Sequence, residues 1–258
     1  MRKKKLFVVL AIYLILNARI AGAVAFDFSH WDALLKKYAY KGTKEGVHLT
    51  LVKYIFLKND KQFKDLILKL EKFPVSDLNS HNEKLSFWVN VYNIFAIKIV
   101  ADNYPLKSIK DVGGFFNQVW DKEAGVIGGN PYSLNDIEHG ILRKMGEPHI
   151  HAAIVCASVS CANLAVYSYK PDIITSQLDN QMEELLANET KGFKVNNDEE
   201  TVYISSIFKW FRKDFKKHGG VINCLKMHAP VEMKQYLKHV ESGDYSIEYF
   251  DFNWNVNE

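Results

Sequence analysis

The chain has 258 residues, of which 48% are hydrophobic, 24% charged and 13% aromatic. This composition is typical of a folded globular protein and excludes a mainly disordered or collagen-like chain. The formal net charge is +3, but five basic residues and no acidic residue lie in the first 23 positions, so the remainder has 28 basic and 30 acidic residues. A folded part without a basic excess argues against a nucleic-acid partner.

Residues 1–25 have the pattern of a secretory signal peptide. Arg2–Lys5 is basic, Leu6–Leu16 is apolar, and the small residues of 21–25 resemble a cleavage site. The alternative is an uncleaved anchor, but eleven apolar residues fall short of the roughly 20 that span a bilayer. We therefore expect an exported protein, periplasmic or secreted, with no stable membrane span after signal removal and with residues 26–258 forming a single domain.

Helices are predicted to dominate the first half of the chain. Apolar residues recur at helical spacing over 60–72 and over 83–104, and each pattern stops at a proline. The 83–104 helix is apolar on both sides, which predicts a buried helix. On one stripe of it lie Ser86, Asn90 and Asn93, and buried amides require hydrogen-bond partners.

The second half mixes helices with short strands. Ser133 and Asp136 resemble a capping box that opens a helix over 133–145. Further helices are predicted over 171–187, 207–217 and 230–240, and strands over 149–159, 201–205 and 247–254. No repeat and no linker divides the chain, so the predicted fold is a helix-rich α+β single domain with a small sheet.

The candidate chemistry lies between residues 138 and 161. This segment contains Glu138, His139, His149, His151, Cys156, Ser158, Ser160 and Cys161. Cys161 follows a polar turn, so its thiol could be exposed and activated by a neighbouring imidazole, whereas Cys156 lies in an apolar run and is expected to be inert. His149, beside Pro148 in an expected turn, is assigned a structural role.

Three arrangements of these residues are possible. If 149–159 is a strand, Cys161 reaches His151 only through a chain reversal, and His139 and His151 meet first. Glu138, His139 and His151 could then bind a metal, although their spacing matches no zinc signature, and we expect no metal and no cofactor. Alternatively, Cys156 and Cys161 could form a disulfide in an oxidising compartment, which would remove the nucleophile.

Several of these segments resemble the family called domain of unknown function 547, of which the chain would be an exported bacterial member. The similar segments are 87–93, 104–109, 133–143, 150–151 with 156–161, Trp210 with 214–215, and 249–254. The chain differs from the family pattern at His149, where arginine is common, and at Ala162, where proline is common. The resemblance supports the choice of site residues but implies no reaction, because the family name assigns none.

Two functions follow as hypotheses. The first is a Cys-dependent hydrolase or acyl transferase with Cys161 as nucleophile, His139 or His151 as base, Glu138, Asn90 or Asn93 orienting the imidazole, and Ser160 in support. The second is a noncatalytic binding or scaffold module with a structural polar network or a Cys156–Cys161 disulfide. In either case the expected partner is a small molecule or a peptide.

Overall fold

Helix α4 (His81–Asn103) is the central element of the first half of the chain. The structure is a computed structural model that describes residues 25–114 and 118–258. It begins at a capping box in which Ser80 and Glu83 accept each other's backbone N–H. Its length and hydropathy would suffice to cross a membrane, but 89% of its most apolar window is buried inside the protein. The predicted buried helix is confirmed. The predicted signal peptide lies outside the described residues, except for Ala25.

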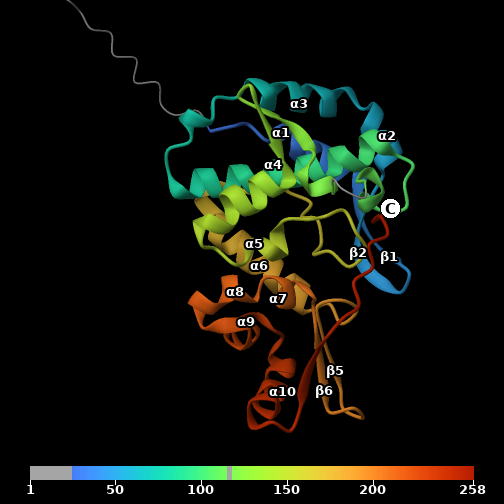
Figure 1. Cartoon of the computed structure of the whole chain (residues 1–258), viewed down its shortest axis with the longest axis vertical. Helices are drawn as coiled ribbons and strands as arrows, with labels where there is room; N and C mark the ends of the chain where they lie inside the picture. Colours follow the sequence, from blue (N-terminus) through green and yellow to red (C-terminus); the bar gives the residue numbers. More distant parts are fainter. Residues whose placement is uncertain (1–24, 115–117) are drawn as a thin grey trace, which may run out of the picture.

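Three helices lie at the same end of the molecule as α4 (Figure 1). They are α1 (Ser29–Tyr38), α2 (Tyr54–Asn59) and α3 (Lys61–Lys72). The α3 helix was predicted from its periodicity, and its start is fixed by the Asp60 side chain, which accepts the N–H of Gln62. Their apolar faces join α4 in the larger of the two main hydrophobic cores.

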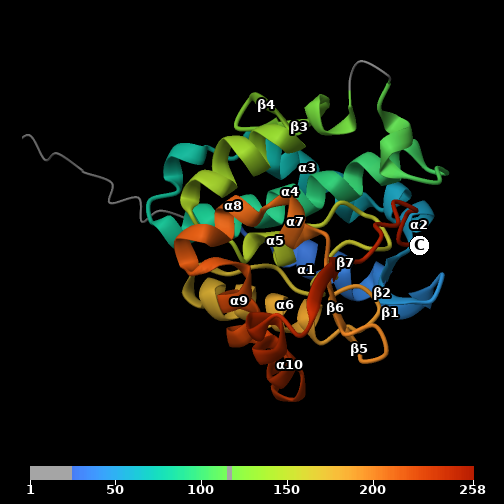
Figure 2. The same cartoon turned by 60° about the horizontal axis from the view of Figure 1, so that its bottom comes forward.

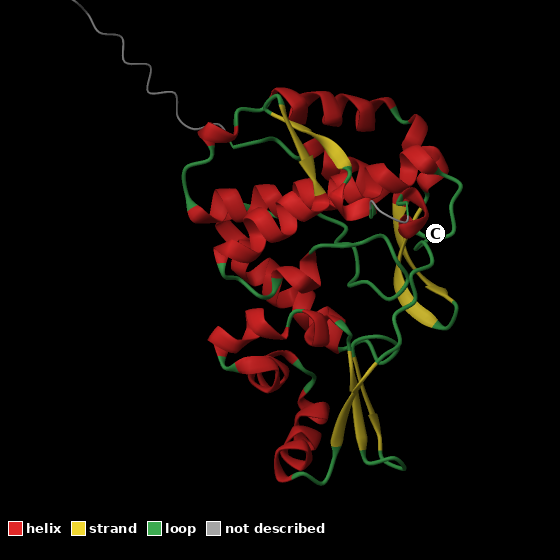
Figure 3. Cartoon of the chain, viewed as in Figure 1, coloured by secondary structure: helices red, strands yellow, loops and turns green. Residues whose placement is uncertain are grey.

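Strands are short and form three separate sheets in the described residues, as Figure 3 shows. Two are antiparallel hairpins, β1 (Ala39–Lys44) with β2 (Val47–Val52), and β3 (Glu123–Ile127) with β4 (Asn130–Ser133). In the third, β6 (Thr201–Ile204) pairs antiparallel with β5 (Phe193–Asn196) and parallel with β7 (Ser246–Tyr249). Together with the helices these sheets confirm the α+β prediction.

The C-terminal part of the chain builds the second hydrophobic core. It combines the three-stranded sheet with α6 (Ile174–Leu186), α7 (Ile207–Trp210), α8 (Arg212–Phe215), α9 (Gly220–His228) and α10 (Val231–Ser242). Figures 1 and 2 show α10 at the end of the molecule opposite to α3 and α4, with α5 (Ile150–Ala153) and α6 between them.

The remaining helical segments are single turns or irregular. They are η1 (Val75–Asp77), η2 (Ile109–Val112), η3 (Val119–Asp121), η4 (Asp136–Ile141), η5 (Leu142–Met145), η6 (Pro171–Ile173) and η7 (Lys216–His218). The predicted helix over 133–145 is thus a π-helical segment followed by a 3₁₀ turn, and it ends at Gly146 in the left-handed region. The predicted helix over 207–217 is interrupted at Phe211, which separates α7 from α8, and η7 follows α8 directly as a 3₁₀ turn.

The prediction of a strand over 149–159 was wrong. The chain forms one helical turn, α5, and then an irregular loop. The buried side chain of Asn93 stabilises this path, because it donates to the carbonyl of Ala153 at 2.9 Å and accepts the N–H of Val155 at 2.8 Å. An apolar run of this length does not distinguish a buried strand from a buried helical turn. The predicted strand over 247–254 is shorter than expected, because only β7 (Ser246–Tyr249) pairs with another strand of the sheet.

Candidate functional site

An aromatic pocket of about 360 Å³ lies where the two halves of the chain meet. Its lining brings together four of the predicted residues, Glu138, His139, His151 and Cys161, although they come from three different segments. The rest of the wall is largely aromatic: Tyr92, Trp120, Trp210, Phe211, Phe252 and Trp254. A concave, mostly apolar pocket with a few converging polar groups is the usual form of a small-molecule site.

His151 is held by a charged group that the sequence analysis did not select. Its Nε2 atom lies 2.8 Å from Oδ2 of Asp214, and Phe211 stacks on the ring with centroids 3.7 Å apart. Because Nε2–H donates to the carboxylate, Nδ1 is the unprotonated nitrogen, and this buried atom has no hydrogen-bond partner among the described residues. Burial lowers the pKa of His151 to about 4, although Asp214 opposes the shift.

Arg143 fixes the carboxylate of Asp214 in turn. Its Nε and Nη2 atoms donate to the two oxygens of Asp214 at 2.6 and 2.9 Å, a bidentate pair. This pair lowers the pKa of Asp214 to about 2. Arg143 Nη1 also lies 3.0 Å from Nδ1 of His139, which must therefore act as the acceptor. Burial and the neighbouring guanidinium lower the pKa of His139.

Glu138 is the acidic group in the pocket wall, and it is only 6% exposed. Its Oε2 atom accepts a hydrogen bond from the hydroxyl of Tyr92 at 3.0 Å. Burial raises the pKa of Glu138 to about 6, while the hydrogen bond from Tyr92 acts in the opposite direction. A carboxyl group with a pKa near neutrality can both accept and donate a proton under physiological conditions.

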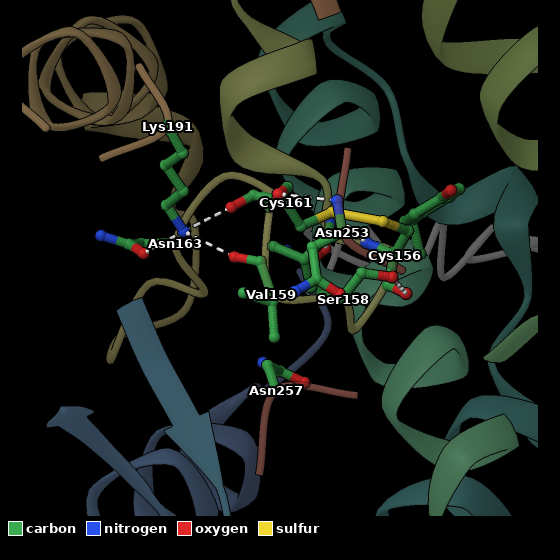
Figure 4. Close-up of a disulfide and its surroundings, with 12 residues drawn as sticks. Cys156, Ser158, Val159, Cys161, Asn163, Lys191, Asn253 and Asn257 are labelled. Atoms are coloured by element: carbon green, nitrogen blue, oxygen red, sulfur yellow. Dashed lines mark hydrogen bonds between the residues drawn. A yellow bond between two sulfur atoms is a disulfide. The ribbon is translucent and has the colours of Figure 1, made fainter. Parts of the chain in front are cut away.

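Cys161 and Cys156 form a disulfide, with their Cα atoms 6.2 Å apart (Figure 4). This was one of the alternatives that the sequence left open. Both residues belong to the pocket lining, and the Cys161 sulfur also accepts the N–H of Cys156 at 2.8 Å. In this oxidised form Cys161 has no thiol, so a thiolate mechanism would require reduction of the bond.

A buried lysine holds the loop that the disulfide closes. Lys191 donates to the carbonyl of Cys161 at 2.6 Å, to Oδ1 of Asn163 at 2.9 Å and to the carbonyl of Val159 at 3.4 Å (Figure 4). Burial lowers the pKa of Lys191 to about 7. Inside the loop, Ala157 has a φ of 57°, a left-handed conformation that L-residues adopt only when their surroundings impose it.

The C-terminal segment secures the same loop from its other side and delivers aromatic side chains to the pocket. Ser160 exchanges hydrogen bonds with Asn253, whose N–H donates to the Ser160 hydroxyl at 2.9 Å. The neighbouring Phe252 and Trp254 rings are 4.4 Å apart, and Trp210 contacts both. Ser160 therefore positions the chain that carries part of the aromatic wall.

Asn90 and Asn93 hydrogen-bond the main chain and no imidazole. Asn90 exchanges two hydrogen bonds of 2.9 Å with the backbone of Tyr169, and Asn93 bridges Ala153 and Val155 as described above. Both amides thus use their nitrogen and their oxygen to join α4 to the loops that flank α5. Their effect on the pocket is to place the backbone that carries His151.

Asp214, Arg143 and Tyr92 are site residues that no local sequence pattern marked. Asp214 is 63 positions from its histidine partner, and no spacing rule links residues across that distance. Tyr92 lies one turn from Trp88 in an apolar helix, and its only signal was the family-like segment 87–93 that contains it. In the described part of the chain, the clustered metal-ligating atoms belong to His149, Asp179 and His228 and not to Glu138, His139 and His151.

Comparison with known proteins yields one family. The family model described as "Protein of unknown function, DUF547" matches residues 75–186. The matched segment contains Glu138, His139, His151, Arg143 and both disulfide cysteines, whereas Asp214 and most of the aromatic wall follow it. No curated protein and no solved structure shows significant similarity to the chain.

Proposed function

Since the chain belongs, over residues 75–186, to the domain of unknown function 547 family, whose description assigns no reaction, we propose a function from its pocket: hydrolysis of a small acyl compound by acid–base chemistry. In this proposal Glu138 is the catalytic base, and water is the nucleophile. His151, held by Asp214, is a positioning residue that accepts a hydrogen bond from the water. The Cys161 thiol takes no part.

One observation carries the proposal. The buried residues Glu138 and His151 line the same aromatic pocket, and Nδ1 of His151 is a buried atom without a hydrogen-bond partner among the described residues. Buried polar atoms in native proteins are normally paired, and unpaired ones mark sites where a ligand or water completes the hydrogen bonding. The aromatic side chains of the pocket would bind the substrate, because flat rings bind planar or apolar groups by stacking.

In the proposed hydrolysis Glu138 alone takes up and returns the proton. Ionised Glu138 removes a proton from water while the water oxygen attacks the carbonyl carbon of the substrate. Collapse of the tetrahedral intermediate breaks the bond to the leaving group, and Glu138 returns the proton to it. A single carboxyl group with a pKa of about 6 can perform both transfers near neutral pH.

We also propose that the protein works outside the cytoplasm. The signal-like residues 1–25 and a disulfide at the pocket support export to an oxidising compartment, because such bonds persist there and are rare in the cytosol. Measuring the fraction of oxidised Cys156 and Cys161 in protein isolated from the cell envelope, by alkylation and mass spectrometry, tests this location. A fully reduced pair would contradict it.

The observation that favours a second candidate, a noncatalytic binding module, is that the disulfide and the amides of Asn90 and Asn93 are already engaged in structural contacts. Both candidates predict that p-nitrophenol binds the pocket and quenches tryptophan fluorescence, since three tryptophans line it. They differ in whether p-nitrophenyl acetate is turned over.

The experiment compares wild-type protein with Glu138→Gln and with the double variant Cys156→Ser/Cys161→Ser. Hydrolysis of p-nitrophenyl acetate that falls at least about 100-fold in Glu138→Gln and persists in the double variant supports the proposal. Loss of turnover in the double variant alone would contradict the proposal and favour the thiolate mechanism. Binding of p-nitrophenol without any turnover would establish the binding module.

A further inference from the structure

A second cluster of metal-ligating side chains lies outside the aromatic pocket. It consists of His149, Asp179 and His228, and one ligand atom of each lies within 4.8 Å of the other two. His149 directly precedes α5, Asp179 lies on α6, and His228 is the last residue of α9. None of the three lines the aromatic pocket.

His228 is the residue that most clearly requires a ligand. Its side chain is only 8% exposed, and neither ring nitrogen has a hydrogen-bond partner among the described residues. A neutral imidazole always presents one N–H donor and one acceptor, and leaving both groups buried without a partner destabilises the folded protein. A metal ion bound to the unprotonated nitrogen would satisfy the acceptor of the ring.

His149 places a second imidazole beside it. The two rings are 4.6 Å apart between centroids and nearly perpendicular, at 77°. Two imidazoles at this distance can both bind the same ion. Nδ1 of His149 also lies 3.1 Å from Oδ1 of Asp179, so an acidic ligand is already in place.

Further carboxylates surround the three residues. Glu183 Oε1 lies 3.9 Å from Nδ1 of His228, and Glu147 Oε1 lies 3.4 Å from Nδ1 of His149. Asp179 and Glu183 are four residues apart on α6 and therefore project from the same face of the helix. Their side chains are 38% and 57% exposed, which leaves the cluster open to ions from solvent.

We propose that His149, Asp179 and His228 bind one Zn²⁺ ion, with Glu183 as the carboxylate placed to supply a fourth ligand. Imidazole and carboxylate donors in a four-coordinate arrangement are typical of zinc, whereas Ca²⁺ and Mg²⁺ prefer sites made of oxygen alone. Because the three ligands come from separate segments, the ion would tie the C-terminal end of α9 to α6 and to the turn before α5.

The test uses the full chain, purified without a polyhistidine tag and treated with EDTA that is then removed. Titration with Zn²⁺ should show one ion per chain, and Co²⁺ should give the strong visible absorption of a tetrahedral site. We expect the zinc Kd to rise at least about 100-fold in His228→Ala and in His149→Ala, and about 10- to 100-fold in Asp179→Asn.

The matched control is His239→Ala. His239 Nδ1 lies 3.5 Å from Oδ2 of Asp244, so it is also a histidine–carboxylate pair, but both side chains are more than half exposed. Its zinc Kd should equal that of the wild type. Asp179→Asn serves if His228→Ala fails to fold, because the Asp179 side chain lies at the surface.

Two results would overturn the proposal. The first is a wild-type protein that fails to bind one zinc ion per chain with a Kd below about 100 μM. Weaker binding than this is what isolated surface histidines would give. The other is unchanged zinc affinity in both His149→Ala and Asp179→Asn.

Discussion

Nε2 of His151 lies 2.8 Å from Oδ2 of Asp214, and this contact joins α5 to α8 across 63 positions of sequence. The same carboxylate accepts two hydrogen bonds from Arg143. The orientation of the pocket histidine therefore depends on a residue outside the segment that matches the family model. A pocket assembled in this way requires both halves of the chain to be folded together.

Asp214→Asn should destabilise the protein by about 2 kcal/mol at pH 7, because Arg143 loses its ionised partner and the native pKa of about 2 is far below the unfolded value of 3.8. A carboxyl group whose pKa is lower in the folded state than in the unfolded chain stabilises the fold at pH values above the unfolded pKa. For Asp214 this contribution disappears as the pH falls from about 4 to 2. Urea unfolding at pH 7 and at pH 2 measures both effects, with the exposed Asp251→Asn as control. An equal difference at the two pH values would contradict the account.

Glu138→Gln should make the protein more stable at pH 8 and not at pH 4. The native pKa of Glu138 is raised from 4.5 to about 6, so the folded state holds its proton more tightly than the unfolded chain, and stability falls as pH rises through this window. The shift corresponds to about 2 kcal/mol. The amide oxygen of the glutamine can still accept the hydrogen bond from the Tyr92 hydroxyl. Thermal unfolding across pH 4–8 provides the measurement, and a variant that is less stable at pH 8 would refute this reasoning.

Tyr92→Phe should move the pH dependence of hydrolysis to higher pH. The Tyr92 hydroxyl donates to the ionised form of Glu138, and removing it leaves burial to raise the pKa of this carboxyl further above 6. Since the proposed base is active when ionised, the rising limb of the pH–rate profile should shift upward by about half a unit to one unit. The neighbouring Trp88→Phe is a control for lost packing and should leave the limb in place. A profile shifted downward in Tyr92→Phe would contradict the assignment.

Lys191→Met should destabilise the protein by about 1–3 kcal/mol at pH 7, because the carbonyl groups of Val159 and Cys161 lose their buried donor. The pKa of Lys191 is lowered from 10.5 to about 7, so the unfolded chain binds the extra proton between these values and wild-type stability rises with pH there. The difference between the two proteins should therefore widen from pH 7 to pH 9. The exposed Lys194→Met is the matched control, and an equal loss in both variants would exclude this role for Lys191.

The fold class and the main helices could be predicted because their signals are local. The α4 helix has a capping box at Ser80 and a proline after Tyr104, and the α3 helix has an apolar stripe. By contrast, the β1–β2 hairpin was missed, because β1 is mostly polar and the alternation of apolar residues at Val47, Leu49 and Leu51 of β2 was not recognised as a strand. The pairing of β6 with β7 gave no local signal for a different reason, because Thr201 and its partner Ser246 are 45 positions apart.

The candidate site was predictable in part for the same reason. Glu138, His139, His151 and Cys161 lie close together in the sequence and were placed in one pocket. The strand assigned to 149–159 was wrong because the interactions that shape this run come from Asn93, 60 residues earlier. The role of Asp214 likewise depends on packing between the two cores, which periodicity within either segment cannot reveal.

The most direct test of the proposed function is the pH dependence of p-nitrophenyl acetate hydrolysis by the Cys156→Ser/Cys161→Ser variant. The account predicts steady-state turnover that rises with pH around a midpoint near 6 and is lost when Glu138→Gln is added. Turnover that is absent without the two cysteines, or that is unaffected by Glu138→Gln, would contradict it.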